Sequence, residues 1–251
     1  MDAQEIKKEV REHYAKIALE NSSCCGPTCG CGTDGEQAIN QLMNDAYKGV
    51  DANVAAAADL GLGCGTPVDY ADLGAGMTVL DLGAGAGIDA FISAKAVGPT
   101  GRAIGLDMTD EMIAKARANR VKLGILNTEF RKGEIENMPV QSDTIDRVIS
   151  NCVINLVPDK RKAFAEIHRV LRPGGKFAIS DVVSRGEISE KYRRDADLWS
   201  GCISGAVDET LYLGWLREAG FQDARVAKEK RYPIPTGLPF EILSITVTGT
   251  K

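Results

Sequence analysis

The sequence predicts an α/β fold with a doubly wound, mostly parallel seven-stranded sheet. From residue 78 onward, short apolar runs of strand composition alternate with helical stretches, a glycine-rich turn follows the first run, and no helix separates the last two runs. Strands that alternate with helices pair in parallel, and two closing strands without a helix add an antiparallel edge. The 251 residues, 44% of them hydrophobic, suffice for one large domain with a continuous core.

The predicted elements follow one another in a regular order. Strands are expected at residues 78–82, 102–107, 127–131, 144–150, 175–182, 223–231 and 241–249, and helices at 88–97, 110–123, 159–171 and 208–219. Residues 2–20 carry apolar side chains at steps of three and four, which indicates an amphipathic helix, and residues 50–60 predict a short one. We expect an N-terminal helical and Cys-rich region that covers the ligand site (1–70), a core (71–183), and a lid with the closing strands (184–251).

Composition and charge argue against several classes of function. A formal net charge of −5 gives no basic surplus for a nucleic-acid or anionic-membrane partner. No stretch approaches the roughly 18 uninterrupted apolar residues of a membrane span, and the N-terminus lacks the apolar core of a secretion signal. Seven cysteines, an odd number, fit reduced thiols that bind or react better than a disulfide framework. We therefore expect a cytoplasmic protein that acts on a small molecule.

A glycine-rich loop after the first predicted strand indicates a ligand site. Gly83, Gly85 and Gly87 occupy alternate positions between this strand and the next helix. Glycine lets the backbone turn sharply and approach a ligand closely, and a helix N-terminus offers unpaired N–H groups. Asp107 ends the following strand, where a carboxylate can accept hydrogen bonds from both hydroxyls of a ribose. Asp81 either contacts an amino group of the ligand or fixes the loop.

The GxGxG spacing resembles the S-adenosylmethionine-dependent methyltransferases of the Rossmann-like class I, because Ile88 stands where a dinucleotide motif needs glycine. Gly133-Glu-Ile-Glu136 after the third strand and the segment at 166–176 before the fifth support the resemblance. It implies S-adenosylmethionine as methyl donor. The implied cofactor-binding residues are Asp81, Gly83, Gly85, Gly87, Asp107, Met108, Glu134, Ile135 and Asn151. A solvated loop is the alternative interpretation of Glu134 and Glu136.

Three loop cysteines say more about the substrate than the glycine-rich motif does. Cys64 lies in a glycine-rich loop before Pro67, Cys152 directly follows the fourth strand, and Cys202 lies in the long segment after the fifth. Ligands bind at the carboxyl edge of open α/β sheets, so we expect Cys152 near the methyl donor and the Cys202 segment as a lid over this edge. A single cysteine is more often a small buried hydrophobe. Three together indicate a soft ligand such as trivalent arsenic or antimony.

Together with the cofactor motifs, the cysteine-bearing segments make the chain resemble the arsenite S-adenosylmethionine methyltransferases over nearly its full length. The matching segments are Glu9-Val-Arg-Glu-His-Tyr14, Ser22-Ser-Cys-Cys-Gly26, Leu62-Gly-Cys-Gly-Thr-Pro67, Ser150-Asn-Cys-Val-Ile-Asn-Leu156 and Gly201-Cys-Ile203. The resemblance implies that Cys152 and Cys202 hold As(III) beside the sulfonium methyl and that Cys64 is the third thiol. The arsenic lone pair would attack the methyl carbon, so no general base is needed. Antimonite is a second candidate substrate.

The resemblance also implies a redox step. Methyl transfer raises arsenic formally to the pentavalent state, and the family is thought to restore it with enzyme thiols. This step leaves a disulfide, for which Cys64 is a natural partner of Cys152. An external thiol reductant, thioredoxin or glutathione, would then reset the enzyme by thiol–disulfide exchange.

Several alternatives stay open on the sequence alone. Cys24, Cys25, Cys29 and Cys31 form a zinc site, capture metalloid for delivery, or make an exposed redox-active tail. The cofactor motifs alone also fit a methyltransferase for an organic acceptor such as a quinone or sterol precursor. The thiols alone fit a non-catalytic protein that sequesters metalloid. Asp181 either lines the pocket or lies on the surface.

Overall fold

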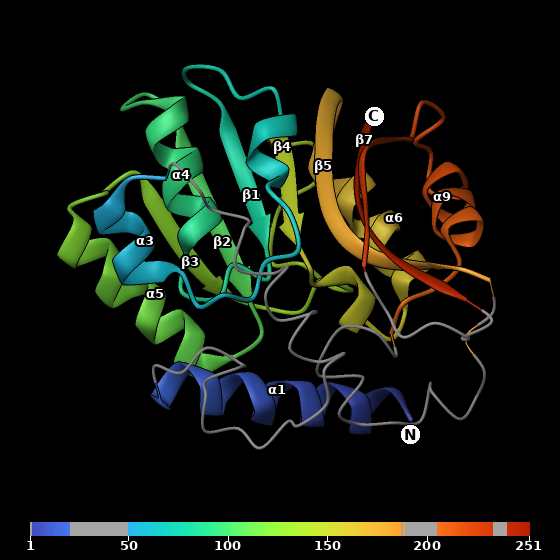
Figure 1. The fold of residues 1–251 in the computed structure, drawn as a ribbon. Coiled ribbons are helices and arrows are strands. Elements are labelled where there is room, and N and C mark those ends of the chain that lie inside the picture. The colour runs from blue at the N-terminus through green and yellow to red at the C-terminus, as the bar shows by residue number, and fades with distance from the viewer. Residues whose placement is uncertain (1, 21–49, 187, 189–204, 233–239) are drawn as a thin grey trace.

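Alternating strand and helical segments build the sheet that the sequence predicts. The computed structural model describes residues 2–20, 50–186, 188, 205–232 and 240–251. Its strands are β1 (Thr78–Leu82), β2 (Arg102–Asp107), β3 (Thr128–Lys132), β4 (Ile145–Asn151), β5 (Leu171–Arg185), β6 (Arg225–Arg231) and β7 (Glu241–Thr250). In the described part of the chain they form one seven-stranded sheet in the order β3-β2-β1-β4-β5-β7-β6 (Figure 1). β1 to β5 are parallel, and β7 runs antiparallel to β5 and β6, so the predicted fold class is confirmed.

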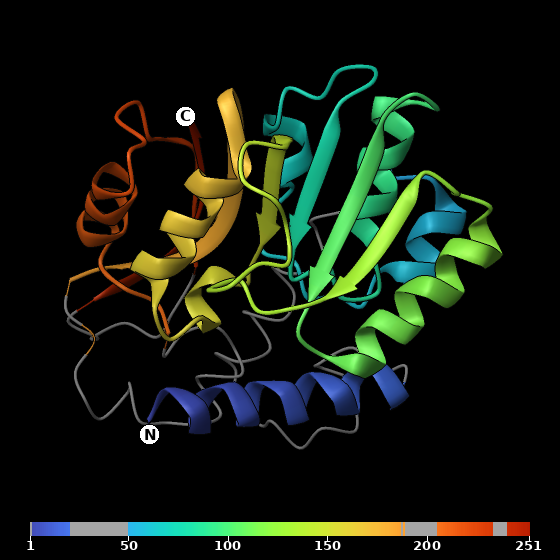
Figure 2. The same ribbon diagram turned by 180° about the vertical axis from the view of Figure 1, so that it is seen from behind.

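Helices cover both faces of this sheet (Figures 1 and 2). On one face lie α3 (Ala52–Ala58), α4 (Ile88–Val97) and α5 (Asp110–Leu123), and on the other lie α6 (Lys160–Val170) and α9 (Glu209–Glu218). The described residues also form the 3-10 turns η1 (Pro67–Tyr70) and η2 (Ile154–Leu156). The predicted helices at 88–97 and 110–123 begin and end where expected.

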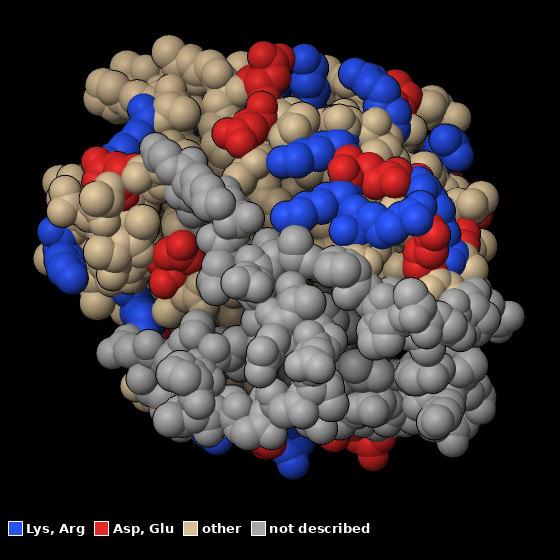
Figure 3. All heavy atoms as spheres, viewed as in Figure 1, with Lys and Arg blue, Asp and Glu red and all other residues tan. Residues whose placement is uncertain are grey.

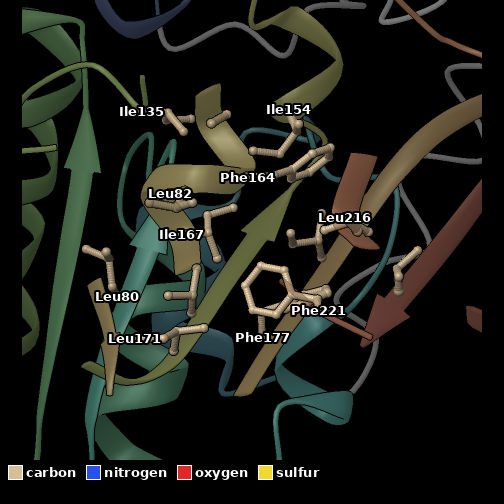
Figure 4. Packing of buried hydrophobic residues seen from close by; sticks show 14 of the residues in the cluster. Leu80, Leu82, Ile135, Ile154, Phe164, Ile167, Leu171, Phe177, Leu216 and Phe221 are labelled. Atoms are coloured by element: carbon tan, nitrogen blue, oxygen red, sulfur yellow. The ribbon is translucent and has the colours of Figure 1, made fainter. Parts of the chain in front are cut away.

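Alternate residues of the central strands are buried on opposite faces of the sheet, as its pleat requires. In β1, Leu80 and Leu82 pack on the side of α6, whereas Val79 packs on the side of α4. Figure 4 shows the first of these cores, where Phe164 of α6 and Leu216 of α9 meet the strands. Burying a side chain of this size contributes about 1.5–3 kcal/mol. These two cores fix the carboxyl edge of the sheet, where the site lies.

β5 is longer at both ends than the predicted strand at 175–182. Its first residue, Leu171, pairs with Ile145, and a register shift separates this pair from the next one, Arg147 with Lys176. The irregularity accommodates the Pro-Gly-Gly run at 173–175, whose last glycine begins the predicted strand. At its other end β5 continues to Arg185 because β7 pairs with it along its length.

The amphipathic helix α1 (Ala3–Glu20) lies across the carboxyl ends of the parallel strands (Figure 1). Ile17 and Ala18 pack against Met112 of α5, and the Nζ of Lys115 donates to the carbonyl of Ala18 at 3.1 Å. These contacts involve the face that the apolar spacing predicts. None of the helices in the described ranges is both long and apolar enough to cross a membrane.

Charged side chains of both signs are mixed on the face shown in Figure 3. Among the described ion pairs, Lys176 Nζ lies 2.8 Å from Asp72 Oδ2 and Lys95 Nζ lies 2.7 Å from Asp51 Oδ2. Exposed pairs of this kind contribute little, about 0–1 kcal/mol each. The stability of the fold therefore rests on its buried apolar clusters rather than on these surface charges.

Candidate active site

The loop between β1 and α4 has a shape that glycine adopts without strain. Gly83, Gly85 and Gly87 have φ angles of 66°, 51° and 99°, in the left-handed region. A side chain at Gly83 would overlap the methyl groups of Val153, and one at Gly87 would lie 2.7 Å from the ring of Phe91. At Gly83 and Gly87 larger residues are therefore excluded by both backbone angle and space, and at Gly85 by backbone angle alone.

One cavity brings together most of the residues predicted to bind the cofactor. Its lining includes Asp81, Gly83, Gly85, Asp107, Met108, Glu134, Ile135, Asn151 and Cys152. Gly87, at the N-cap of α4, and Cys64 do not line it, although their neighbours Ala86 and Gly63 do. The cavity lies at the carboxyl ends of β1 and β4, where the strand order reverses. Open α/β sheets bind ligands at this point.

Asp107 holds the glycine loop from the end of β2. Its Oδ2 accepts the backbone N–H of Gly85 at 3.0 Å, and its Oδ1 accepts the N–H of Thr109 at 2.9 Å. Burial raises the pKa of Asp107, while these hydrogen bonds oppose the rise because they favour the ionised form. The carboxylate is thereby fixed in the cavity wall, and its other lone pairs can accept hydrogen bonds from ligand hydroxyls.

Two buried carboxyl groups lie in the same wall. Asp81 comes from β1 and Asp89 from the first turn of α4, and each is no more than 3% exposed. Burial, and then the charge of Asp89, raise the pKa of Asp81 well above its usual range. Among the described residues no group hydrogen-bonds to Oδ2 of Asp81. A cationic ligand group would stabilise the ionised pair, so the arrangement fits a positively charged donor.

Sequence reasoning identified Asp81 but missed Asp89. The available signal was an acidic residue in the first turn of the helix that follows the glycine loop. On its own this signal also fits a residue that stabilises the helix N-terminus. The side chain of Asp89 lines the cavity only because α4 packs with this turn against β1.

α1 is tied to the acidic loop after β3. Lys7 Nζ lies 2.8 Å from Glu134 Oε2 and also pairs with Glu136. Burial lowers the pKa of Lys7, but hydrogen bonds to the two carboxylates outweigh it, so the pKa is raised. Glu136 is buried and accepts the N–H of Asp159 at 3.2 Å, so the solvated-loop interpretation is wrong for this residue. Lys7 and Val10 also line the cavity, a contact between distant segments that local patterns do not reveal.

Two of the three predicted thiols lie in one apolar cluster. Cys64 is 8% exposed and Cys152 is 3% exposed, and they share the cluster with Leu156, Val182, Ile188, Ala206, Tyr232, Phe240 and Ile242. Cys152 has a φ angle of 60° and lines the cavity. Cys202 lies outside the described residues, as do Cys24, Cys25, Cys29 and Cys31. The structure therefore places one predicted thiol in the cavity wall and a second in the adjoining apolar cluster.

A buried carboxyl group precedes Val182, a member of the thiol cluster, in β5. Asp181 is fully buried and does not line the cavity, so neither predicted alternative for it holds. Its Oδ2 accepts the hydroxyl of Tyr212 at 3.1 Å, its Oδ1 accepts the N–H of Val182 at 3.0 Å, and the cationic Lys160 is close enough to favour its ionised form. Burial dominates and raises the pKa of Asp181 to about 7.

Asp181→Asn is expected to remove part of the pH dependence of stability. The pKa of Asp181 is raised from 3.8 to about 7, so between these values the unfolded chain loses a proton that the folded protein keeps. The free energy of unfolding therefore falls as pH rises through this window and stays lower above it, by up to about 4 kcal/mol. Urea unfolding at about pH 4 and about pH 8 should show the variant gaining stability over the native protein only at the higher pH. Equal differences at both values would contradict this assignment.

The fold and its cavity define a methyltransferase domain. Residues 73–220 match the family model described as "Methyltransferase domain", so the chain belongs to this class. Within this class it belongs to the arsenite methyltransferase family, because it is 32% identical to the solved arsenic(III) S-adenosylmethionine methyltransferase of Chlamydomonas reinhardtii. That comparison has a TM-score of 0.71 and covers 85% of this chain and 73% of the other.

Curated relatives agree with this family. The chain is 45% identical over 233 residues to an arsenite methyltransferase of Halobacterium salinarum, covering 90% of this chain and 60% of the relative. It is 32% identical over 233 residues to one of Aquipseudomonas alcaligenes, covering 90% of this chain and 64% of the relative. The chain thus spans less than two thirds of the length of these relatives.

Proposed function

We propose that the protein transfers methyl groups from S-adenosylmethionine to trivalent arsenic held by its thiols. The observation that carries this proposal is the burial of Cys64 and Cys152 in one apolar cluster, with Cys152 also in the wall of the cofactor-type cavity. A methyltransferase for an organic acceptor has no need of such a pair. Similarity to arsenite methyltransferases supports the same substrate.

The cavity residues fit S-adenosylmethionine, which supplies an electrophilic methyl group on a cationic sulfur. Asp107 would accept hydrogen bonds from the ribose hydroxyls, and the glycine loop would allow the cofactor to approach closely. Asp81 and Asp89 would balance the positive charge of the donor, a role supported by the buried Oδ2 of Asp81, which has no hydrogen-bond partner among the described residues. Met108, Glu134 and Ile135, which line the same cavity, would supply the remaining cofactor contacts.

In this proposal Cys64, Cys152 and Cys202 bind As(III) as thiolates, because soft sulfur ligands suit a soft centre. The apolar cluster around the first two excludes water that would compete as an oxygen ligand. The lone pair of arsenic attacks the methyl carbon, so the protein has to orient two reactants and needs no general base. Antimonite has the same ligand preference and is a candidate second substrate.

Methyl transfer leaves arsenic formally pentavalent. Two thiols return two electrons to it and leave as a disulfide, and we assign this step to Cys64 and Cys152. A dithiol protein of the thioredoxin type, or glutathione, then reduces the disulfide by exchange. This cycle requires a reducing compartment, which supports a cytoplasmic location.

Turnover tests the proposed function directly. The protein is incubated with arsenite, S-adenosylmethionine and a thioredoxin system, and arsenic species are separated and quantified. We expect methylated arsenic in more than stoichiometric amount, dependent on both the methyl donor and the reductant. Stoichiometric arsenite binding that does not depend on the donor would instead identify a sequestering protein. Methylation of a quinone with no methylated arsenic would identify the organic-acceptor alternative.

A further inference from the structure

Asn151 lies between the thiol loop and the cofactor cavity. The backbone N–H of Cys64 donates to its Oδ1 at 3.0 Å, and its Nδ2 donates to the carbonyl of Gly65 at 2.8 Å. The same Nδ2 donates to Oδ2 of Asp89 at 3.2 Å. One side chain at the end of β4 thus holds two consecutive residues of the Cys64 loop and one carboxylate of the cavity wall.

The orientation of this amide is fixed by chemistry. A backbone N–H can only donate and a backbone carbonyl can only accept, so the oxygen of Asn151 must face Cys64 and its nitrogen must face Gly65. Aspartate cannot replace it, because a second carboxylate oxygen would face the carbonyl of Gly65 and the carboxylate of Asp89. Asparagine therefore provides both the acceptor that the N–H of Cys64 needs and the donor that the carbonyl of Gly65 and the carboxylate of Asp89 need.

The other side of the Cys64 loop is also held. Ser244 Oγ donates to the carbonyl of Cys64 at 2.6 Å, and a side chain at Gly65 would come within 2.5 Å of Ser180 Oγ. Cys152, next to Asn151, donates its N–H to the carbonyl of Ser180 at 2.8 Å. The backbone of Cys152 is therefore held by β5 and that of Cys64 by β7, the strand paired with β5, and Asn151 supplies the link on the cavity side.

We propose that Asn151 is a positioning residue that fixes the Cys64 loop beside Cys152 and joins it to Asp89 of the cofactor cavity. This inference deepens the proposed function and rests on it. Two thiols bind one arsenic atom more tightly when the protein already holds them at the right separation. The loss of conformational entropy on ordering the loop then occurs on folding and does not weaken binding. Asn151 acts through the backbone of Cys64 and need not touch arsenic.

The test measures the effect of Asn151 on the thiol loop separately from its effect on the cofactor cavity. Alkylation rates of Cys64 are measured peptide by peptide with iodoacetamide in the native protein, Asn151→Ala and Asn151→Asp. Asn127→Ala is the matched control, because the Nδ2 of Asn127 also donates to backbone carbonyls, those of Ala94 and Gly98 at 2.9 and 3.0 Å, away from the thiols. Dissociation constants for arsenite and for S-adenosylhomocysteine are measured on the same samples.

We expect both Asn151 variants to raise the alkylation rate of Cys64 and to weaken arsenite binding by about tenfold or more. Asn151→Ala loses both hydrogen bonds to the loop, whereas Asn151→Asp keeps the acceptor for the N–H of Cys64 but places a carboxylate oxygen against the carbonyl of Gly65. The affinity for S-adenosylhomocysteine should change less, because its sulfur carries no positive charge for Asp89 to balance, and the control should leave Cys64 protected. Unchanged Cys64 alkylation in both variants would overturn the inference, as would an equal loss of affinity for the two ligands. If the native protein bound no arsenite, the proposed function would fail, and the alkylation rates would still decide the role of Asn151.

Discussion

Replacing Cys152 by serine is expected to lower the rate of arsenite methylation by at least about 10³-fold, because a ligand that orients the reactant is lost. Serine keeps the size and the backbone angle of the site but offers a hard oxygen in place of a soft sulfur. Cys152 is 3% exposed and lines the cavity, so no water-borne thiol can easily substitute for it. The affinity for S-adenosylhomocysteine should remain near the native value. Product quantification and isothermal titration check the two parts separately.

Val182→Ala is the matched control for this variant. Val182 belongs to the same apolar cluster but carries no sulfur and does not line the cavity. Its truncation should cost about 1–2 kcal/mol of stability and leave most of the methylation rate. If the Cys152→Ser variant methylated arsenite at the native rate, Cys152 would not be an arsenic ligand.

Gly83→Ala should destabilise the fold by about 3 kcal/mol and weaken cofactor binding, because the backbone angle and the available space both oppose a side chain. Gly83 has a φ of 66°, and a Cβ there would overlap the methyl groups of Val153. Relief of the overlap would move Val153, the residue after Cys152. Urea unfolding and titration with S-adenosylhomocysteine measure the two effects.

Gly124→Ala separates backbone strain from steric overlap. Gly124 has a φ of 66° and a ψ of 19°, in the left-handed region, but a Cβ at this position would have nothing within 4 Å. Its replacement should cost only about 1 kcal/mol and leave cofactor affinity unchanged. Val153→Ala combined with Gly83→Ala should recover part of the lost stability, as expected for two residues in contact. If Gly83→Ala and Gly124→Ala lowered stability equally, the overlap with Val153 would not contribute to the effect of Gly83→Ala.

Local sequence patterns predicted the parts of the site that lie at strand ends. Asp81, Asp107 and Cys152 each lie at or near the carboxyl end of a predicted parallel strand, and such ends meet at one edge of the sheet. The glycine spacing likewise identified the loop between β1 and α4. These features depend only on topology, and they line one cavity in the structure.

Other parts of the site depend on how distant segments pack. The ion pairs of Lys7 with Glu134 and Glu136 arise only when α1 lies across the sheet edge. The amide of Asn151 contacts Cys64 because the loop before η1 folds back onto β4. No periodicity or spacing encodes such contacts. Sequence reasoning therefore assigned Asn151 to the cofactor alone and missed its bonds to the thiol loop.

Arsenic K-edge X-ray absorption is the most direct test of the central claim, that the thiols hold trivalent arsenic beside the cofactor cavity. The protein is loaded with one equivalent of arsenite in the presence of S-adenosylhomocysteine, and the nearest neighbours of arsenic are identified. We predict a shell of three sulfur atoms without oxygen in the native protein, and replacement of one sulfur by oxygen in Cys152→Ser. An oxygen shell in the native protein, or an unchanged sulfur shell in the variant, would contradict the account.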